Sequence, residues 1–156
     1  MVSLFFQACA GLCLFRIFKC GRIGVPAIFR HSQQTNVFDF SYVGETVDGQ
    51  AVCRGIAAVR PGALPGWVKY YEQASIVLYL TDQSGRILEQ HKLDYPAGLP
   101  VDKALEFRFN VDSPTQLDDR SFYVSFGYFM LFAEFDSLGG EGSGGRKIIR
   151  HEAGYH

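Results

Sequence analysis

Residues 122–135 read FYVSFGYFMLFAEF, the longest strand-like stretch of the chain. In a strand, successive side chains point to opposite faces of the sheet. One face would therefore carry Phe122, Val124, Phe126, Tyr128, Met130 and Phe132, and the other Tyr123, Ser125, Gly127, Phe129, Leu131 and Ala133. Neither face is polar from 126 to 133, whereas a strand of a simple two-layer sandwich has one wet face. The stretch therefore predicts a central strand whose second face also has apolar surroundings.

Three interpretations of that second face stay open. In the first, the N-terminal segment or a loop covers the second face, and the face is part of an enlarged core. In the second, the face is an exposed apolar surface that docks a protein partner, a second copy of the chain or lipid. In the third, the rings line a cavity for a small apolar ligand.

Strand signals recur on both sides of this stretch. Residues 38–42 and 105–109 alternate apolar with polar side chains, and Asp48-Gly49 is a strong hairpin signal between 38–42 and 51–59. Residues 74–80 (ASIVLYL) predict a central strand, and a turn at 81–85, with Gly85 at a positive φ, leads into a second arm at 86–93. Residues 67–73 fit a helical turn or a strand start, and 146–151 fit a last edge strand.

The pattern as a whole predicts an all-β protein. About seven strands at this spacing, without a long helix after residue 35, predict an antiparallel β-sandwich of immunoglobulin-like type. A closed barrel is the alternative architecture. Parallel α/β folds are disfavoured because their crossovers need helices of a dozen residues or more.

The charge distribution divides the chain near Thr35. Residues 1–35 carry four basic side chains and no acid, whereas residues 36–156 carry 11 basic and 16 acidic ones, which together give the net charge of −1. We therefore expect an apolar, basic helical head at 1–35, a sandwich domain at 36–138, and a Gly-rich linker with a polar tail at 139–156. A net charge near zero disfavours a generally basic nucleic-acid binder.

The head has three interpretations: a membrane anchor or atypical export signal, a helix packed on the domain, or an extension that is never translated. Its apolar run, Leu4 to Phe15, is short for a membrane span. As a helix it would place Cys9, Cys13 and Cys20 on one stripe. We expect membrane association at the cell envelope, although the basic residues after the run favour the cytoplasmic side for the segment that follows.

The segment SIVLYLTDQSGRIL, residues 75–88, resembles the immunoglobulin-like FxLYD-type domains of bacterial envelope proteins. Leu78, Tyr79, Asp82 and Gly85 carry the resemblance, together with earlier glycines at 44 and 55, over about residues 40–126. It implies a sandwich with a binding or scaffolding role and transfers no catalytic residues. The Pro/Gly-rich insert at 61–66 departs from the family pattern.

Several motifs suggest chemistry but lack the required context. His151, Glu152 and His156 resemble a zinc-protease motif, but the two histidines are five residues apart rather than four. Gly140, Gly142 and Gly145 fit a dinucleotide fingerprint, yet too few residues follow for the helix and acid that it needs. A flexible linker and a polar tail explain these residues better.

Other reactive side chains are isolated. Cys53 is the single cysteine after residue 20 and reads as a small core residue. His91 and Glu89 fall on one strand face, which is more typical of a solvated face than of a proton-transfer pair. Adjacent acids at 118 and 119 fit a turn. We predict no catalytic residue and no cofactor.

The sequence thus predicts a non-enzymatic, membrane-tethered module that binds a protein partner or itself. The candidate binding residues are the aromatic side chains of two segments, Trp67, Tyr70 and Tyr71, and Phe126, Tyr128, Phe129 and Phe132. One alternative is a carrier of a small apolar ligand. The other is a metal-binding protein or enzyme that uses His151, Glu152 and His156.

Overall fold

The computed structural model describes residues 29–47, 50–111, 122–136 and 145–154. Every regular element in these ranges is a strand, and the described residues contain no helix. Residues 1–28 of the predicted head, the acids at 118 and 119, most of the Gly-rich linker and His156 lie outside the described residues. The strands are β1 (Phe29–Gln34), β2 (Phe38–Val47), β3 (Gln50–Val59), β4 (Tyr70–Asp82), β5 (Ile87–Tyr95), β6 (Leu99–Pro100), β7 (Leu105–Val111), β8 (Phe122–Ala133) and β9 (Lys147–Glu152).

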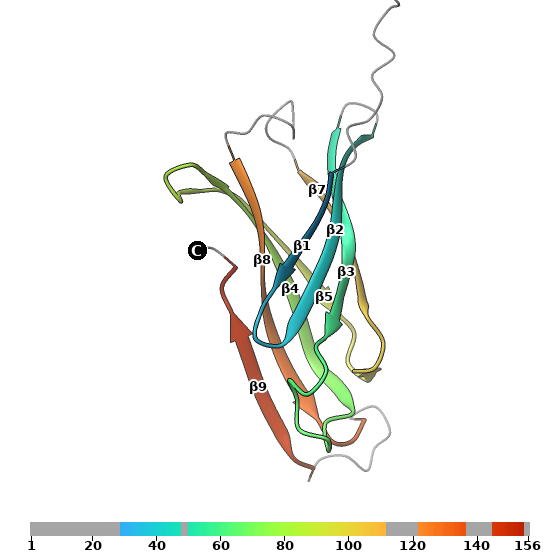
Figure 1. The fold of residues 1–156 in the computed structure, drawn as a ribbon. Helices are drawn as coiled ribbons and strands as arrows, with labels where there is room; N and C mark the ends of the chain where they lie inside the picture. Colours follow the sequence, from blue (N-terminus) through green and yellow to red (C-terminus); the bar gives the residue numbers. More distant parts are fainter. Residues whose placement is uncertain (1–28, 48–49, 112–121, 137–144, 155–156) are drawn as a thin grey trace, which may run out of the picture.

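These strands form two sheets that face one another (Figure 1). Sheet A has the order β1-β2-β3-β7, and sheet B has the order β5-β4-β8-β9, with the short β6 paired to β4. Every pairing is antiparallel. The all-β, antiparallel, sandwich-like architecture predicted from the sequence is confirmed.

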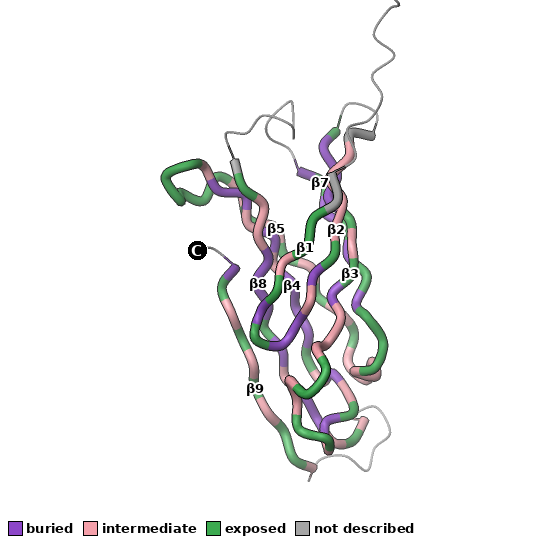
Figure 2. Tube along the Cα trace, in the orientation of Figure 1, coloured by how far each residue is buried: buried purple, intermediate pink, exposed green. Residues whose placement is uncertain are grey.

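The core lies between the inward faces of the two sheets. Strand β7 alternates strictly between buried and exposed residues, as the sequence of 105–109 predicts. Figure 2 shows buried residues along the central strands, whereas edge strand β9 and the hairpin between β4 and β5 are exposed or partly exposed. The fully or nearly fully buried large side chains include Phe38, Phe40, Tyr71, Ile76, Leu78, Leu80, Phe126, Met130 and Phe132.

Aromatic rings join the two sheets at the centre of the core. The Phe126 ring of β8 stacks on Phe40 of β2 with centroids 5.1 Å apart and planes at 9°. It also packs on Phe107 of β7 at 4.8 Å and meets Tyr42 edge-on at 4.8 Å. Each such pair contributes about 0.5–1.5 kcal/mol beyond the area it buries. The inward-facing rings of β8, above all Phe126, therefore hold the two sheets together.

Strand β8 is central, as predicted, because β4 pairs with one edge and β9 with the other. The predicted strand at 146–151 is also confirmed, as β9 at the edge of sheet B. Residues 67–73 form a strand start rather than a helical turn, since β4 begins at Tyr70. Gly85 has a φ of 83° in the β4–β5 hairpin, which confirms the predicted turn.

Strand β1 extends the sandwich into the residues that composition assigns to the head. It pairs with β2 from Phe29↔Gly44 to Gln34↔Asp39. The composition change near Thr35 thus falls in the β1–β2 turn, where Thr35 Oγ1 accepts a hydrogen bond from Phe38 N. The sequence FRHSQQ shows little apolar alternation because β1 is an edge strand.

Candidate functional site

Four of the seven predicted binding residues lie in the core. Phe126, Phe132 and Tyr71 have no exposed surface, and Tyr128 is 4% exposed. Burial raises the pKa of the Tyr71 phenol above its ordinary range. These side chains hold the two sheets together and do not reach a partner at the surface.

Tyr128 also links the end of β9 to the β1–β2 turn. Its hydroxyl donates to Glu152 Oε2 at 3.2 Å, and Asn36 N donates to the same oxygen at 3.0 Å. Burial, together with the negative charge of Glu152, raises the pKa of Tyr128 to about 12. Glu152, one of the three candidate metal ligands, therefore has a structural role.

Trp67 lies beside a charged pair at the start of β9. The Arg146 guanidinium sits 4.7 Å from the Trp67 ring centroid, and its Nη2 is 2.8 Å from Glu134 Oε1. That hydrogen bond, with the charge of Arg146, lowers the pKa of the Glu134 carboxyl. Trp67 and Tyr70 are both half-buried, and Tyr70 pairs with Ala133 and Pro100 in sheet B. Trp67 thus already stacks on a cation of its own chain.

Phe129 lies on the outward face of β8 and is 38% exposed. In register with it are Ser75 of β4 and His151 of β9. A hollow of about 440 Å³ on this face is lined by side chains that include Val77, Tyr79, Lys92 and Phe129. The second face of β8 is therefore partly open to solvent within the part of the chain that the structure describes.

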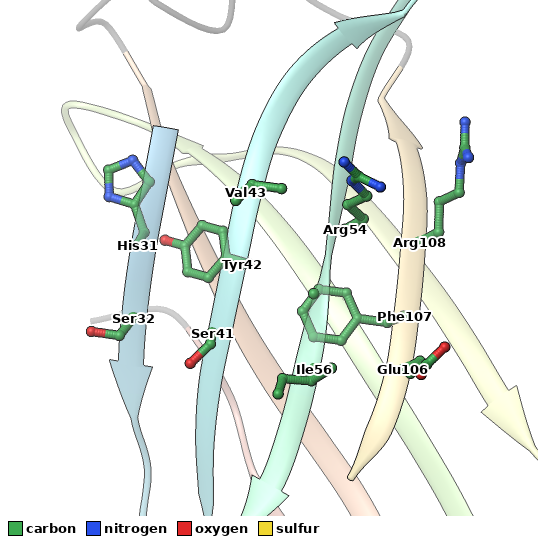
Figure 3. A pocket seen from close by; sticks show the side chains of 11 residues that line it. His31, Ser32, Ser41, Tyr42, Val43, Arg54, Ile56, Glu106, Phe107 and Arg108 are labelled. Carbon is green, nitrogen blue, oxygen red and sulfur yellow. The ribbon is translucent and has the colours of Figure 1, made fainter. Parts of the chain in front are cut away.

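A larger depression lies on sheet A. It measures about 930 Å³ and crosses all four strands (Figure 3). We call it the sheet-A groove; it is lined by His31 and Ser32 of β1, Ser41, Tyr42 and Val43 of β2, Arg54, Gly55 and Ile56 of β3, and Glu106, Phe107 and Arg108 of β7. Its volume falls at the upper end of the usual range of ligand sites.

Gly55 determines how the strands meet at the groove. A Cβ atom there would lie 2.2 Å from Ser41 O, 2.7 Å from Phe107 Cζ and 2.8 Å from Tyr42 Cα. Because Gly55 has no side chain, the ring of Phe107, its partner in the β3–β7 register, occupies the space above it. The glycine therefore lets the backbone of β2 and the Phe107 ring of β7 pack closely against β3, which lies between those two strands.

One half of the groove is rich in neutral polar groups. Ser32 and Ser41 are directly opposite in the β1–β2 register, and both are exposed. The neighbouring pair, His31 and Tyr42, stacks with ring centroids 5.4 Å apart. Burial, together with nearby Cys53, raises the pKa of Tyr42 to about 12. Its hydroxyl donates to Val124 O of sheet B at 3.4 Å, so it faces the core and not the groove.

The other half carries two arginines. Arg54 and Arg108 are directly opposite in the β3–β7 register, and both are exposed. Arg54 Nε lies 3.0 Å from Glu45 Oε1, whereas Arg108 makes no ion pair with any residue that the structure describes. Along the direction of the strands, Figure 3 shows both guanidinium groups at the same end of the groove as His31 of β1, and Ile56 and Glu106 toward the other end.

Cys53 is a core residue, as predicted: it is 2% exposed, and burial raises the pKa of its thiol to about 12. His91 Nε2 and Glu89 Oε2 are 3.0 Å apart on β5, both half-buried. Neither side chain has a hydrogen bond to a Ser, Thr or Cys among the described residues. These groups are thus not assembled into a nucleophile-and-base pair.

The described residues contain no group of three or more His, Cys, Asp or Glu side chains placed to hold a metal ion. His151 lies on strand β9, not on a helix. Because His151 and Glu152 are adjacent in this strand, their side chains point to opposite faces of the sheet. Within the same described ranges, no helix has the length and apolar character to cross a membrane.

Comparisons with known proteins give no relative: the chain matches no protein-family model, no curated protein and no solved structure. The resemblance to FxLYD-type domains stays a prediction.

Sequence reasoning did not identify the sheet-A groove. Arg54 and Arg108 each occupy a polar position of an alternating strand, which is typical of a solvated face. The available signal was Gly55 in the middle of β3, since a glycine inside a strand often marks a close approach. Its meaning depends on the register between β3 and β7, which local sequence does not specify.

Proposed function

We propose that this chain is a non-enzymatic binding module, an immunoglobulin-like β-sandwich that presents the sheet-A groove to a partner. The observation that carries the proposal is the groove itself. It has a volume of about 930 Å³, is open to solvent, and is lined by residues of all four strands of sheet A. It combines apolar, hydroxyl and guanidinium groups, a mixture typical of recognition surfaces.

The strand order supports an immunoglobulin-like topology. In immunoglobulin domains, strands C, F and G share one sheet, which C′ extends in variable domains, and A, B and E share the other. Sheet B then corresponds to C′-C-F-G as β5-β4-β8-β9, and β2-β3-β7 of sheet A corresponds to A-B-E. Strand β1 is an addition beside A. Domains of this architecture commonly bind through surfaces carried on the rigid sandwich.

The groove is tested by filling it. Full-length protein is probed against an array of short synthetic peptides, alongside the variants Ser41→Trp and Gln90→Trp. Ser41 lines the groove, whereas Gln90 is exposed on the opposite sheet, opposite Tyr79. We expect Ser41→Trp to abolish binding of the peptides that the wild type retains and Gln90→Trp to preserve it. Equal binding by the two variants, or no binding by the wild type, would contradict the proposal.

The proposal includes a membrane tether through the head, most of which lies outside the described residues. Its support is the apolar run Leu4 to Phe15, followed by basic residues. The N-terminal mass of the protein isolated from cells, measured on soluble and membrane fractions, tests it. We expect an intact head in the membrane fraction, released by detergent and not by salt. A soluble protein with an intact head would contradict the tether.

A further inference from the structure

The two arginines of the sheet-A groove form a like-charge pair across two strands. Arg54 and Arg108 are register partners, so their side chains leave the sheet side by side on its outward face. Like charges in directly opposite positions destabilise a sheet. Folding alone does not explain such a pair, whereas an anionic partner would.

One of the two charges is already compensated within the chain. Arg54 binds Glu45 through two contacts, Nε to Oε1 at 3.0 Å and Nη2 to Oε2 at 3.2 Å. Arg108 has no such partner among the described residues. Glu106, two positions along β7 on the same face, forms no ion pair with it and lies toward the other end of the groove (Figure 3).

The Glu45–Arg54 contact indicates which anion fits. A carboxylate that lies along a guanidinium with two oxygens is the arrangement that Arg favours. A second carboxylate, supplied by a ligand, would give Arg108 the partner that Glu45 gives Arg54. It would also reduce the repulsion between the two guanidinium groups.

The rest of the groove fits a short extended peptide. Four strands at about 4.8 Å spacing span about 14 Å, the length of about four extended residues. Val43 and Ile56 offer apolar contacts, and Ser32 and Ser41 offer hydroxyl groups that donate or accept hydrogen bonds. Alternating acidic and aliphatic side chains would match this surface.

We infer that the sheet-A groove recognises an acidic peptide segment of a protein partner, with Arg108, beside Arg54, as the group that binds its carboxylate. This inference rests on the proposed binding function of the same groove. The floor of the groove is a sheet face, and its backbone groups are paired within the sheet. The peptide is therefore recognised through its acidic and aliphatic side chains, which determine the specificity.

The test uses isotopically labelled full-length protein and two blocked pentapeptides. One peptide alternates valine with glutamate, and the other has glutamine in place of each glutamate. Titrations are followed by NMR through the arginine side-chain resonances. We expect the glutamate peptide to shift the resonances of Arg54 and Arg108, to bind at least about tenfold more tightly than the glutamine peptide, and to weaken as salt rises.

Variants of Arg108 separate binding from folding. Arg108→Gln should weaken the glutamate peptide about tenfold, whereas Lys69→Gln, which removes an exposed charge before β4, should leave its binding unchanged. Arg108→Glu should abolish binding while keeping the melting temperature at or above that of the wild type, because it places an opposite charge across from Arg54.

Other outcomes overturn the inference. They are equal binding of the two peptides, unchanged binding by Arg108→Gln, or inorganic phosphate binding as tightly as the glutamate peptide. If Ser41→Trp blocks both peptides and they bind equally well to the wild type, the groove function stands and the carboxylate inference fails. If Ser41→Trp blocks neither, the proposed function itself fails.

Discussion

The side-chain amide of Gln33 in β1 pairs with both backbone polar groups of Phe126 in β8. Gln33 Nε2 donates to Phe126 O at 2.9 Å, and Phe126 N donates to Gln33 Oε1 at 2.8 Å. Strand β9 ends at Glu152, opposite Tyr128, so its register with β8 does not extend to Phe126. A single side chain of sheet A thus replaces a neighbouring strand and connects the two sheets along one side of the sandwich.

Replacing Gln33 with leucine keeps the size of the side chain and removes both hydrogen bonds. The partly buried N–H and C=O of Phe126 would then lack a partner. We expect the free energy of unfolding to fall by about 1–3 kcal/mol, the typical cost of leaving such groups unsatisfied. Urea denaturation followed by Trp67 fluorescence measures the change, because Trp67 is the single tryptophan of the chain.

Gln34→Leu is the matched control. Gln34 follows Gln33 in the same strand but is exposed, and its amide bonds to Asp39 Oδ1 at 3.0 Å on the surface. Its replacement should change stability by no more than about 0.5 kcal/mol. Equal effects of the two substitutions would show that the Gln33–Phe126 pair contributes nothing of its own.

Gly55→Ala tests the close approach beneath the groove. The new methyl group would meet Ser41 O at 2.2 Å and Tyr42 Cα at 2.8 Å, which are backbone atoms that cannot turn aside. We expect a loss of about 1–3 kcal/mol in thermal or urea unfolding. Gly66→Ala is the control, since no atom lies within 4 Å of its Cβ position. A neutral Gly55→Ala would mean that β2 moves away from β3 easily.

Much of the fold follows from local pattern. Alternation from Leu105 to Val111 predicts β7, and the apolar run at 74–80 predicts the central strand β4. In β7 the buried side chains alternate strictly with exposed ones, so the period of two is visible without knowing the partner strand. In β4 the run is apolar throughout because the strand lies between β5 and β8.

Strand β1 and the groove depend on contacts between distant residues. The polar sequence of β1 is compatible with a strand because it pairs at an edge and because Gln33 reaches Phe126. Likewise, alternation separates the two faces of β8 correctly, yet it does not say which face looks inward. The face with Phe126, Tyr128 and Phe132 is buried because sheet A covers it. Only the register of distant strands brings Arg54 and Arg108 together.

Cys53 should behave as an inert core residue. Burial raises the pKa of its thiol to about 12, so very little of the reactive thiolate exists at neutral pH. We expect iodoacetamide to leave Cys53 unmodified in the native protein and to alkylate it in urea, as read by peptide mass mapping. Mapping is needed because the chain contains three further cysteines. Alkylation at similar rates in both states would contradict the burial of the thiol.

Phe129 tests the interpretation that the outward face of the aromatic strand docks a second copy of the chain. It is the one member of the β8 candidates that points outward, so Phe129→Ser should change stability by less than a core substitution. Phe126→Ala, the core counterpart, should cost about 3–5 kcal/mol. We expect sedimentation velocity of full-length protein to show concentration-dependent association that Phe129→Ser abolishes. Association that persists in Phe129→Ser would exclude this surface.

Asp82 makes the β4–β5 hairpin sensitive to acid. Its Oδ1 accepts hydrogen bonds from the Ser84 hydroxyl at 2.6 Å, Ser84 N at 2.9 Å and Arg86 N at 3.1 Å. The Ser84 hydroxyl first, and then Arg86 N, lower the pKa of the Asp82 carboxyl below its ordinary value. A carboxyl whose pKa is lower in the folded state stabilises that state above its ordinary pKa, and this stabilisation is lost as the pH falls through the folded value.

Asp82→Asn should therefore lower the melting temperature at pH 7, and the difference from the wild type should shrink in acid. Asp102→Asn, which removes the same charge from a side chain without a bonded partner among the described residues, should show no such convergence. A pH-independent effect of Asp82→Asn would mean that its charge does not stabilise the turn.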